Sequence, residues 1–75
     1  MKILLFGKIA EQIGSNHIFL ENIHSTEKLK EKLVEHYPFL QQTSFSIAID
    51  RKIIHTDITL LDAQEIALLP PFSGG

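Results

Sequence analysis

The sequence predicts an α+β fold in which one main helix packs on one face of a mixed β-sheet. Two observations carry this prediction. Short aliphatic segments lie on both sides of one clear amphipathic helix, and a period of two runs through a segment that follows that helix. The chain of 75 residues has room for one domain, which we expect to span residues 1–75.

Composition narrows the class of protein. The chain has no cysteine, which excludes disulfides, thiolate nucleophiles and cysteine-based zinc sites. Its 7 Lys+Arg and 9 Asp+Glu residues give a net charge of −2, which differs from the basic footprint of a nucleic-acid binder. No apolar run approaches the roughly 20 residues that a membrane span needs. We therefore expect a cytoplasmic protein whose partners include no nucleic acid and no membrane.

The first part of the chain is predicted to form two strands before the main helix. Aliphatic residues at Met1–Phe6, stopped by Gly7, indicate a strand. Residues Lys8–Ile13 fit a short helical turn that ends at Gly14. After a polar turn, we expect a second strand over His17–Ile23.

The clearest helix is predicted over Thr26–His36. Ser25 before it is a suitable N-cap. Leu29 and Leu33 lie four residues apart on one apolar stripe, while charged residues cover the other side. Pro38 disfavours helical geometry in the residue before it, and so ends the helix.

The rest of the chain is predicted to contain short strands and turns. Phe45, Ile47 and Ile49 alternate with small or polar residues, which indicates a half-buried strand. The other expected elements are a polar connection at Gln41–Ser44, a turn at Asp50-Arg51, a short strand around Lys52–His55, a polar corner at Asp62–Gln64, and a final strand over Glu65–Leu69 that Pro70-Pro71 stops.

Strand alternation leaves apolar side chains on the face away from the helix. Lys2 marks the wetter face of the first strand, and Phe6 shares that face. Glu65 marks the wetter face of the last strand, which Leu69 shares, and Ile53 can join them. An exposed apolar patch commonly marks a partner surface. The alternative is that a loop covers these residues or that a bulge turns one of them inward.

Conventional active-site motifs are weak in the sequence. The histidines, which lack metal-ligand spacing and are interpreted as surface or satisfied residues, are His17, His24, His36 and His55. The serines have no evident base or oxyanion loop. Gly7 and Gly14 match neither the dinucleotide-binding pattern nor the P-loop pattern. We expect no metal site, and no cofactor bound by this chain alone.

The unusual feature is the C-terminal segment Leu68-Leu69-Pro70-Pro71-Phe72-Ser73-Gly74-Gly75. Glycine lacks a Cβ, so a terminal Gly-Gly is thin enough to thread a narrow channel and leaves its carboxylate unhindered. Pro70-Pro71 provides a stiff, extended exit from the sheet. Residues 70–75 are therefore predicted to form an extended functional tail that enters another protein's active site. A frayed terminus is the alternative.

This ending, the start Met1–Gly7 and the corner Asp62–Ala67 resemble the ubiquitin-like β-grasp carriers of the MoaD family, the small sulfur-carrier subunits of molybdopterin synthase. The similarity runs along the whole chain, and Pro-Pro-x-Ser-Gly-Gly is its most specific part. The resemblance implies a β-grasp fold. It also implies that a MoeB-like, E1-like enzyme uses ATP to adenylate Gly75, and that sulfur then replaces one oxygen to give a thiocarboxylate.

In such a carrier the tail enters a MoaE-like large subunit and donates sulfur to cyclic pyranopterin monophosphate, which builds the dithiolene of molybdopterin. The catalytic pocket is expected on the large subunit, so that this chain is a non-catalytic sulfur donor. The residues that the resemblance assigns to partner binding are Phe6, Ile53, Leu69, Pro70, Pro71, Phe72 and Ser73, with Gly74 as the thin approach to the reactive Gly75. Two positions depart from the family pattern: Ala10, where relatives often have Arg, and Ala63, in a turn that usually reads Asp-Gly-Asp-Glu.

Three other functions stay open on the sequence. A ThiS-like sulfur carrier for thiamine thiazole synthesis also ends in Gly-Gly, but does not typically carry the Pro-Pro-Phe-Ser stalk. A protein modifier would form isopeptide bonds through Gly75. A plain β-grasp interaction module would use the open apolar face and have an inert tail.

Overall fold

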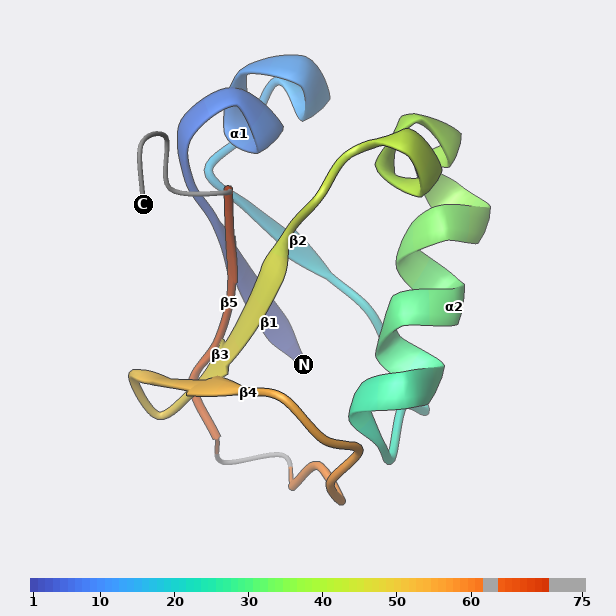
Figure 1. The fold of residues 1–75 in the computed structure, drawn as a ribbon, viewed down its shortest axis with the longest axis vertical. Coiled ribbons are helices and arrows are strands. Elements are labelled where there is room, and N and C mark those ends of the chain that lie inside the picture. Colours follow the sequence, from blue (N-terminus) through green and yellow to red (C-terminus); the bar gives the residue numbers. More distant parts are fainter. Residues whose placement is uncertain (62–63, 71–75) are drawn as a thin grey trace.

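The computed structural model describes residues 1–61 and 64–70. The elements, in chain order, are β1 (Lys2–Leu5), α1 (Gly7–Ile13), β2 (His17–Phe19), α2 (Thr26–His36), the 3₁₀ helix η1 (Pro38–Gln42), β3 (Ser46–Ile49), β4 (Lys52–Ile54) and β5 (Ile66–Leu69). The strands form one five-stranded sheet in the order β2-β1-β5-β3-β4, and α2 lies along one side of it (Figure 1). The predicted α+β class is confirmed.

The sheet is mixed, as predicted. β1 and β5 run parallel, with Leu5 beside Leu68, whereas the other neighbouring strands are antiparallel. Parallel strands end at the same edge of a sheet. The start of α1 therefore lies beside the end of β5, at the top of Figure 1.

The core lies between α2 and the sheet. Leu29 and Leu33 of the predicted apolar stripe are both 0% exposed. The buried strand residues that meet them belong to one face of the sheet and are Ile3, Leu5, Ile47, Ile49, Ile66 and Leu68. The alternation predicted for the first and last strands is thus the alternation that the structure has.

The start of α2 and the end of α1 follow the predicted capping. The side chain of Ser25 accepts a hydrogen bond from the Lys28 N–H at 3.2 Å, which caps the start of α2. Gly14 ends α1 with φ 85, and its N–H donates to the carbonyl of Ala10. Ala10, the first departure from the family pattern, is half-buried and packs against the core.

One predicted strand is too long, and one short helix was not predicted. The strand expected over His17–Ile23 ends at Phe19, because the chain turns at Asn22 with φ 61, a left-handed conformation that no strand continues. Ile23 reaches the core from this loop instead. The helix η1 was not predicted: it includes the first two residues of the polar connection expected at Gln41–Ser44, and it turns Leu40, just before that connection, into the core at 1% exposure. The other strands are one or two residues shorter than predicted at their ends.

The predicted turn at Asp50-Arg51 is confirmed as a two-residue hairpin. Both residues have positive φ, 51 and 70, as a type I′ turn requires. The Asp50 carboxylate accepts from the Glu65 N–H at 2.9 Å, and the Asp50 N–H donates to the Glu65 carbonyl at 2.8 Å. These two bonds tie the hairpin to the start of β5.

Candidate functional site

The predicted patch residues surround one open hollow on the sheet face opposite α2. The hollow has a volume of about 360 Å³. Its lining consists of Leu4, Phe6, Ala48, Arg51, Ile53, Glu65, Ala67 and Leu69. The structure therefore brings together Phe6, Ile53 and Leu69, which lie far apart in the sequence.

The hollow exists because the smallest side chains stand at the centre of this face. One row of paired residues crosses all the strands here, in the order His17, Leu4, Ala67, Ala48 and Ile53. The two alanines are paired in the middle of that row, so the floor of the sheet is low between larger apolar neighbours. Two small residues and their bulky surroundings thus shape a concave apolar surface.

The rim of the hollow is exposed where the sequence predicted it. Phe6 is 45% exposed and Ile53 is 39% exposed, while Leu69 is half-buried. The predicted placement of the three residues on the open face is what the structure shows. Their role in docking a partner stays a prediction.

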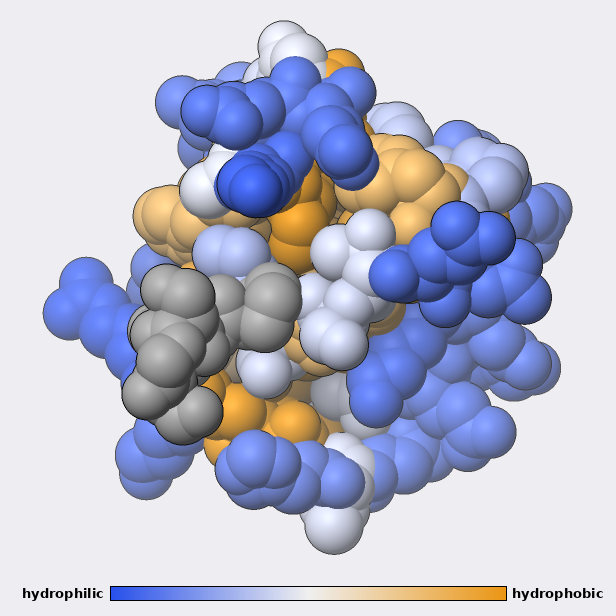
Figure 2. All heavy atoms as spheres, turned by 45° about the horizontal axis from the view of Figure 1, so that its top comes forward, coloured by the Kyte–Doolittle hydropathy of each residue, from blue (hydrophilic) through white to orange (hydrophobic). Residues whose placement is uncertain are grey.

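Charge is unequally distributed around the molecule. At the edge of the hollow, Arg51 Nε lies 3.6 Å from Glu65 Oε2 in an exposed ion pair. The outer face of α2 carries two further exposed pairs, including Lys28 with Glu31. Accordingly, the right margin of Figure 2, over α2, is mainly hydrophilic, whereas hydrophobic side chains are exposed towards the middle and the left.

The hollow is continuous in sequence with the predicted tail. Leu69 lines the hollow, and the half-buried Pro70 follows it directly. The remaining residues predicted for the tail, Pro71, Phe72, Ser73, Gly74 and Gly75, lie outside the described residues, as does Ala63.

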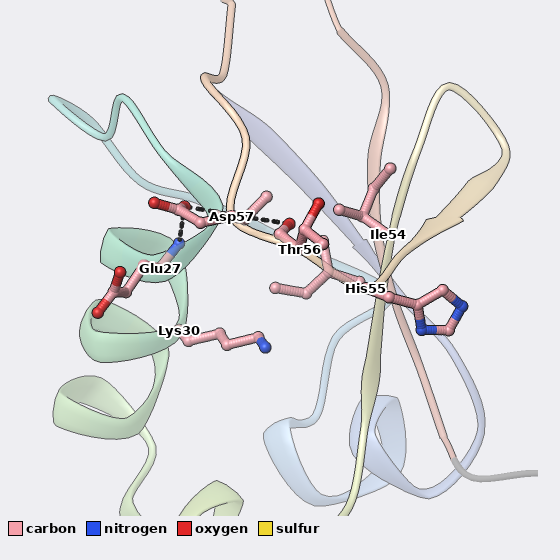
Figure 3. Close-up of a pocket in the computed structure, with 8 residues that line it drawn as sticks. Glu27, Lys30, Ile54, His55, Thr56 and Asp57 are labelled. Atoms are coloured by element: carbon pink, nitrogen blue, oxygen red, sulfur yellow. Dashed lines mark hydrogen bonds between the residues drawn. The ribbon is translucent and has the colours of Figure 1, made fainter.

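A second, smaller cavity of about 190 Å³ lies beside the start of α2 (Figure 3). In it, Asp57 Oδ1 accepts hydrogen bonds from the Glu27 N–H at 2.9 Å and from the Thr26 hydroxyl at 3.0 Å. Thr26 Oγ1 in turn accepts from the Ile58 N–H at 3.0 Å. Figure 3 shows the Asp57 carboxylate directed at the first turn of the helix. Asp57 thereby satisfies the Glu27 N–H, one of the free N–H groups at the start of α2, and the network fastens the segment after β4 to the helix.

The hydrogen bonds in this network lower the pKa of the Asp57 carboxyl group below its ordinary value. The bond from the Glu27 N–H is the largest cause, and the Thr26 hydroxyl is the next. Sequence reasoning missed Asp57 because its partner on the helix is 30 residues away, and no local pattern announces the contact.

The histidines show no shared site. His24, His36 and His55 are exposed, and the His17 ring meets the Phe19 ring edge-on with centroids 5.4 Å apart. Within residues 1–61 and 64–70, no three His, Asp or Glu side chains are grouped to hold a metal ion. In the same ranges, no helix has the length and apolar character to cross a bilayer.

Known proteins resemble this chain along nearly its whole length. The model of the ThiS family matches residues 3–75. The molybdopterin synthase sulfur carrier subunit of Dictyostelium discoideum is 36% identical over 81 aligned positions, covering 99% of this chain and 94% of that protein. The subunit of the same name from Caenorhabditis elegans is 28% identical, covering 100% of this chain and 96% of the relative.

The fold also has a counterpart among solved structures. The crystal structure of SAMP1 from Haloferax volcanii superposes with a TM-score of 0.72, at 21% identity, over 99% of this chain and 97% of the other. At 21% identity the match is evidence for the fold alone, and it confirms the predicted ubiquitin-like β-grasp. The family match and the full-length relatives also confirm the resemblance to the MoaD carriers: the chain belongs to the ThiS family.

Proposed function

We propose that this chain is the sulfur carrier subunit of a molybdopterin synthase. The supporting observation is the full-length similarity to the Dictyostelium discoideum subunit of that name, at 36% identity, in a chain that itself ends in Gly74-Gly75. The match to the ThiS family does not by itself separate this function from the ThiS-like alternative. The names of both relatives favour the molybdopterin route.

The proposed chemistry takes place at the carboxylate of Gly75. A carboxylate is a poor acyl donor, so an E1-like enzyme first joins one of its oxygens to the α-phosphate of ATP and pyrophosphate leaves. Sulfide (HS⁻) then attacks the acyl carbon, and AMP departs with that oxygen. The product is a thiocarboxylate, which needs no cysteine in the carrier, and this chain has none.

The thiocarboxylate then transfers its sulfur to cyclic pyranopterin monophosphate in the large subunit of the synthase. Gly75 returns to a carboxylate when water supplies the oxygen. The carrier contributes placement to this step, whereas the large subunit contributes the catalytic pocket.

The hollow supports this proposal because of where it lies. Leu69 lines it and Pro70 begins the tail, so a partner seated over the hollow also stands at the root of the tail. An apolar, concave surface with exposed Phe6 and Ile53 suits a partner that inserts an apolar side chain between them. Docking and tail insertion are then two parts of one binding event.

The test is intact-mass analysis after incubation with an E1-like activating enzyme, ATP and a sulfur donor. The expected result is a mass gain equal to the difference between one sulfur and one oxygen, absent when Gly75 is deleted. An unchanged mass, with an activator that thiocarboxylates another carrier in parallel, contradicts the proposal. Synthesis of molybdopterin on addition of a MoaE-like subunit and cyclic pyranopterin monophosphate separates it from the ThiS-like alternative, which predicts thiazole formation instead.

A further inference from the structure

Gly7 and Pro70 meet where the two parallel strands end. β1 and β5 keep a constant register, in which Ile3 lies beside Ile66 and Leu5 beside Leu68. Two further residues along the same register bring Gly7, the first residue of α1, to Pro70, the first residue of the tail. The topology of the sheet therefore places the start of α1 against the root of the tail.

The contact between these residues depends on the missing side chain of Gly7. A Cβ built on Gly7 would lie 2.8 Å from Pro70 Cγ, 3.5 Å from its Cβ and 3.7 Å from its Cδ. Carbon atoms in contact ordinarily lie about 3.5–4.0 Å apart. Gly7 also has φ 59, in the left-handed region that favours glycine. Pro70 thus lies in a space that only a glycine leaves open.

The ring of Pro70 gives its Cγ little freedom to move away from position 7. It is closed on the backbone nitrogen and holds φ near −65°, so its Cγ can shift only by a change of ring pucker and not as far as the end of a flexible side chain. Leu69, the residue before the proline, is held in extended geometry for the same steric reason. A side chain at position 7 would therefore move the chain at the point where residues 71–75 begin.

We propose that Gly7 is a positioning residue for the tail: its bare backbone seats Pro70 and fixes the point from which the segment ending at Gly75 leaves the sheet. The proposal rests on the proposed sulfur-carrier function, because the root of the tail matters only if Gly75 must reach a partner's active site. A fixed root lowers the entropy lost when the tail enters that site and keeps the reacting carboxylate in register.

The chain offers a matched control at the other end of α1. Gly14 also has positive φ, 85, but a Cβ there would meet nothing within 4 Å. Gly7→Ala and Gly14→Ala therefore both place a side chain in the left-handed region, and only Gly7→Ala collides with the tail. The two variants separate backbone strain from tail displacement.

The functional test measures the rate of thiocarboxylate formation with an E1-like enzyme, ATP and sulfide. Intact-mass analysis monitors the reaction, at a temperature below the unfolding temperature of each variant. We expect Gly7→Ala to lower kcat by up to about 100-fold, as a misplacement near 1 Å does. KM should change less than kcat, since no side chain that lines the hollow is substituted, and Gly14→Ala should stay close to the unsubstituted chain. Equal losses in the two variants would overturn the proposal.

A second substitution tests whether the loss comes from the contact. Pro70→Ala removes Cγ, the atom at 2.8 Å, and leaves Cβ at the ordinary distance of 3.5 Å. In a chain that carries Pro70→Ala, we expect Gly7→Ala to lower kcat no more than Gly14→Ala does. A loss that persists there in full would mean that Gly7 acts through the fold and not through Pro70.

An NMR measurement decides the contact without sulfur chemistry, and serves even if Gly7→Ala fails to fold. The isolated, unsubstituted chain should show nuclear Overhauser effects between the Gly7 α protons and the Pro70 γ protons. Their absence overturns the inference while leaving the sulfur-carrier function untouched. If they are present and a competent activator leaves the chain without sulfur, the proposed function fails and the positioning role fails with it.

Discussion

The two faces of the sheet use the same strands in opposite ways. On the face towards α2, Ile66 and Leu68 of β5 are 0% exposed and meet the leucines of the helix. On the other face, Ala67 forms the floor of the hollow and Leu69 its edge. Successive side chains of a strand point to opposite faces, so one tetrapeptide serves both the core and the candidate docking surface.

The difference in side-chain size shows what each face is packed against. Large aliphatic residues cover the first face because α2 supplies their packing partners within the chain. Paired alanines, Ala48 and Ala67, occupy the middle of the second, where a partner would supply the missing volume. Stability and partner binding should therefore respond to different substitutions, even at neighbouring positions.

The largest expected effect is on stability and comes from the core face. Leu68→Ala deletes a fully buried side chain and leaves a cavity between β5 and α2, which should cost about 2–5 kcal/mol. For a domain of this size that is a large share of the whole free energy of unfolding. Urea denaturation measures it, and a loss below about 1 kcal/mol would contradict the assignment of the core.

The neighbouring substitution Leu69→Ala should act mainly on binding. It removes apolar surface at the edge of the hollow, so we expect the Kd for a MoaE-like large subunit to rise roughly tenfold to hundredfold, corresponding to about 1.5–3 kcal/mol. The loss of stability should be well below that of Leu68→Ala. Titration calorimetry with the large subunit measures it, and an unchanged Kd would remove the hollow from the interface.

The hydrogen bonds to Asp57 predict that the stability of the fold depends on pH. The folded state lowers the pKa of Asp57, so its stabilising contribution is present above the ordinary value of 3.8 and is lost as the pH falls through the lower, folded value. Asp57→Asn should therefore lower the unfolding temperature at neutral pH and flatten the fall in stability under acid.

Ser25→Ala is the matched control for that experiment. It removes the other side-chain cap of α2 without removing a charge, and should cost about 1 kcal/mol at every pH. Thermal unfolding between neutral and strongly acidic pH compares the two variants. Parallel pH profiles for both would contradict the role given to the Asp57 carboxylate.

The smallest effect is expected at the hairpin beside the hollow. Arg51 has φ 70, a conformation that costs a non-glycine residue about 1–2 kcal/mol. Arg51→Gly relieves this strain. It also raises the conformational entropy of the unfolded chain, which costs about 0.4–1 kcal/mol of stability, and removes the exposed ion pair with Glu65. The free energy of unfolding from urea denaturation should change by only about a few tenths of a kcal/mol. A loss above about 1 kcal/mol would show that the ion pair contributes more than exposed pairs do.

Local periodicity made much of this arrangement predictable. The helix Thr26–His36 and the open-face placement of Phe6, Ile53 and Leu69 follow from spacings of four and two residues. Contacts between distant segments had no such signal, which is why the cap from Asp57 was missed.

Left-handed backbone conformations and strand pairing were also not predictable from the sequence. The second strand was predicted too long because the left-handed turn at Asn22 does not show in a run of apolar residues. The contact of Gly7 with Pro70 depends on the parallel pairing of β1 with β5, which neither segment encodes alone. The site residues predicted from the sequence at Gly74 and Gly75 lie outside the described part of the chain, and their role stays a prediction.

The most direct test compares the full chain with a chain that lacks Gly75. It measures how much molybdopterin each of them forms when bound to the large subunit. The hollow is unchanged in the chain without Gly75, so this chain should bind the large subunit with nearly the Kd of the full chain and yet deliver no sulfur after treatment with the activating enzyme, ATP and a sulfur donor. Molybdopterin formation that continues without Gly75 would contradict the proposal that the last carboxylate of this chain carries the sulfur.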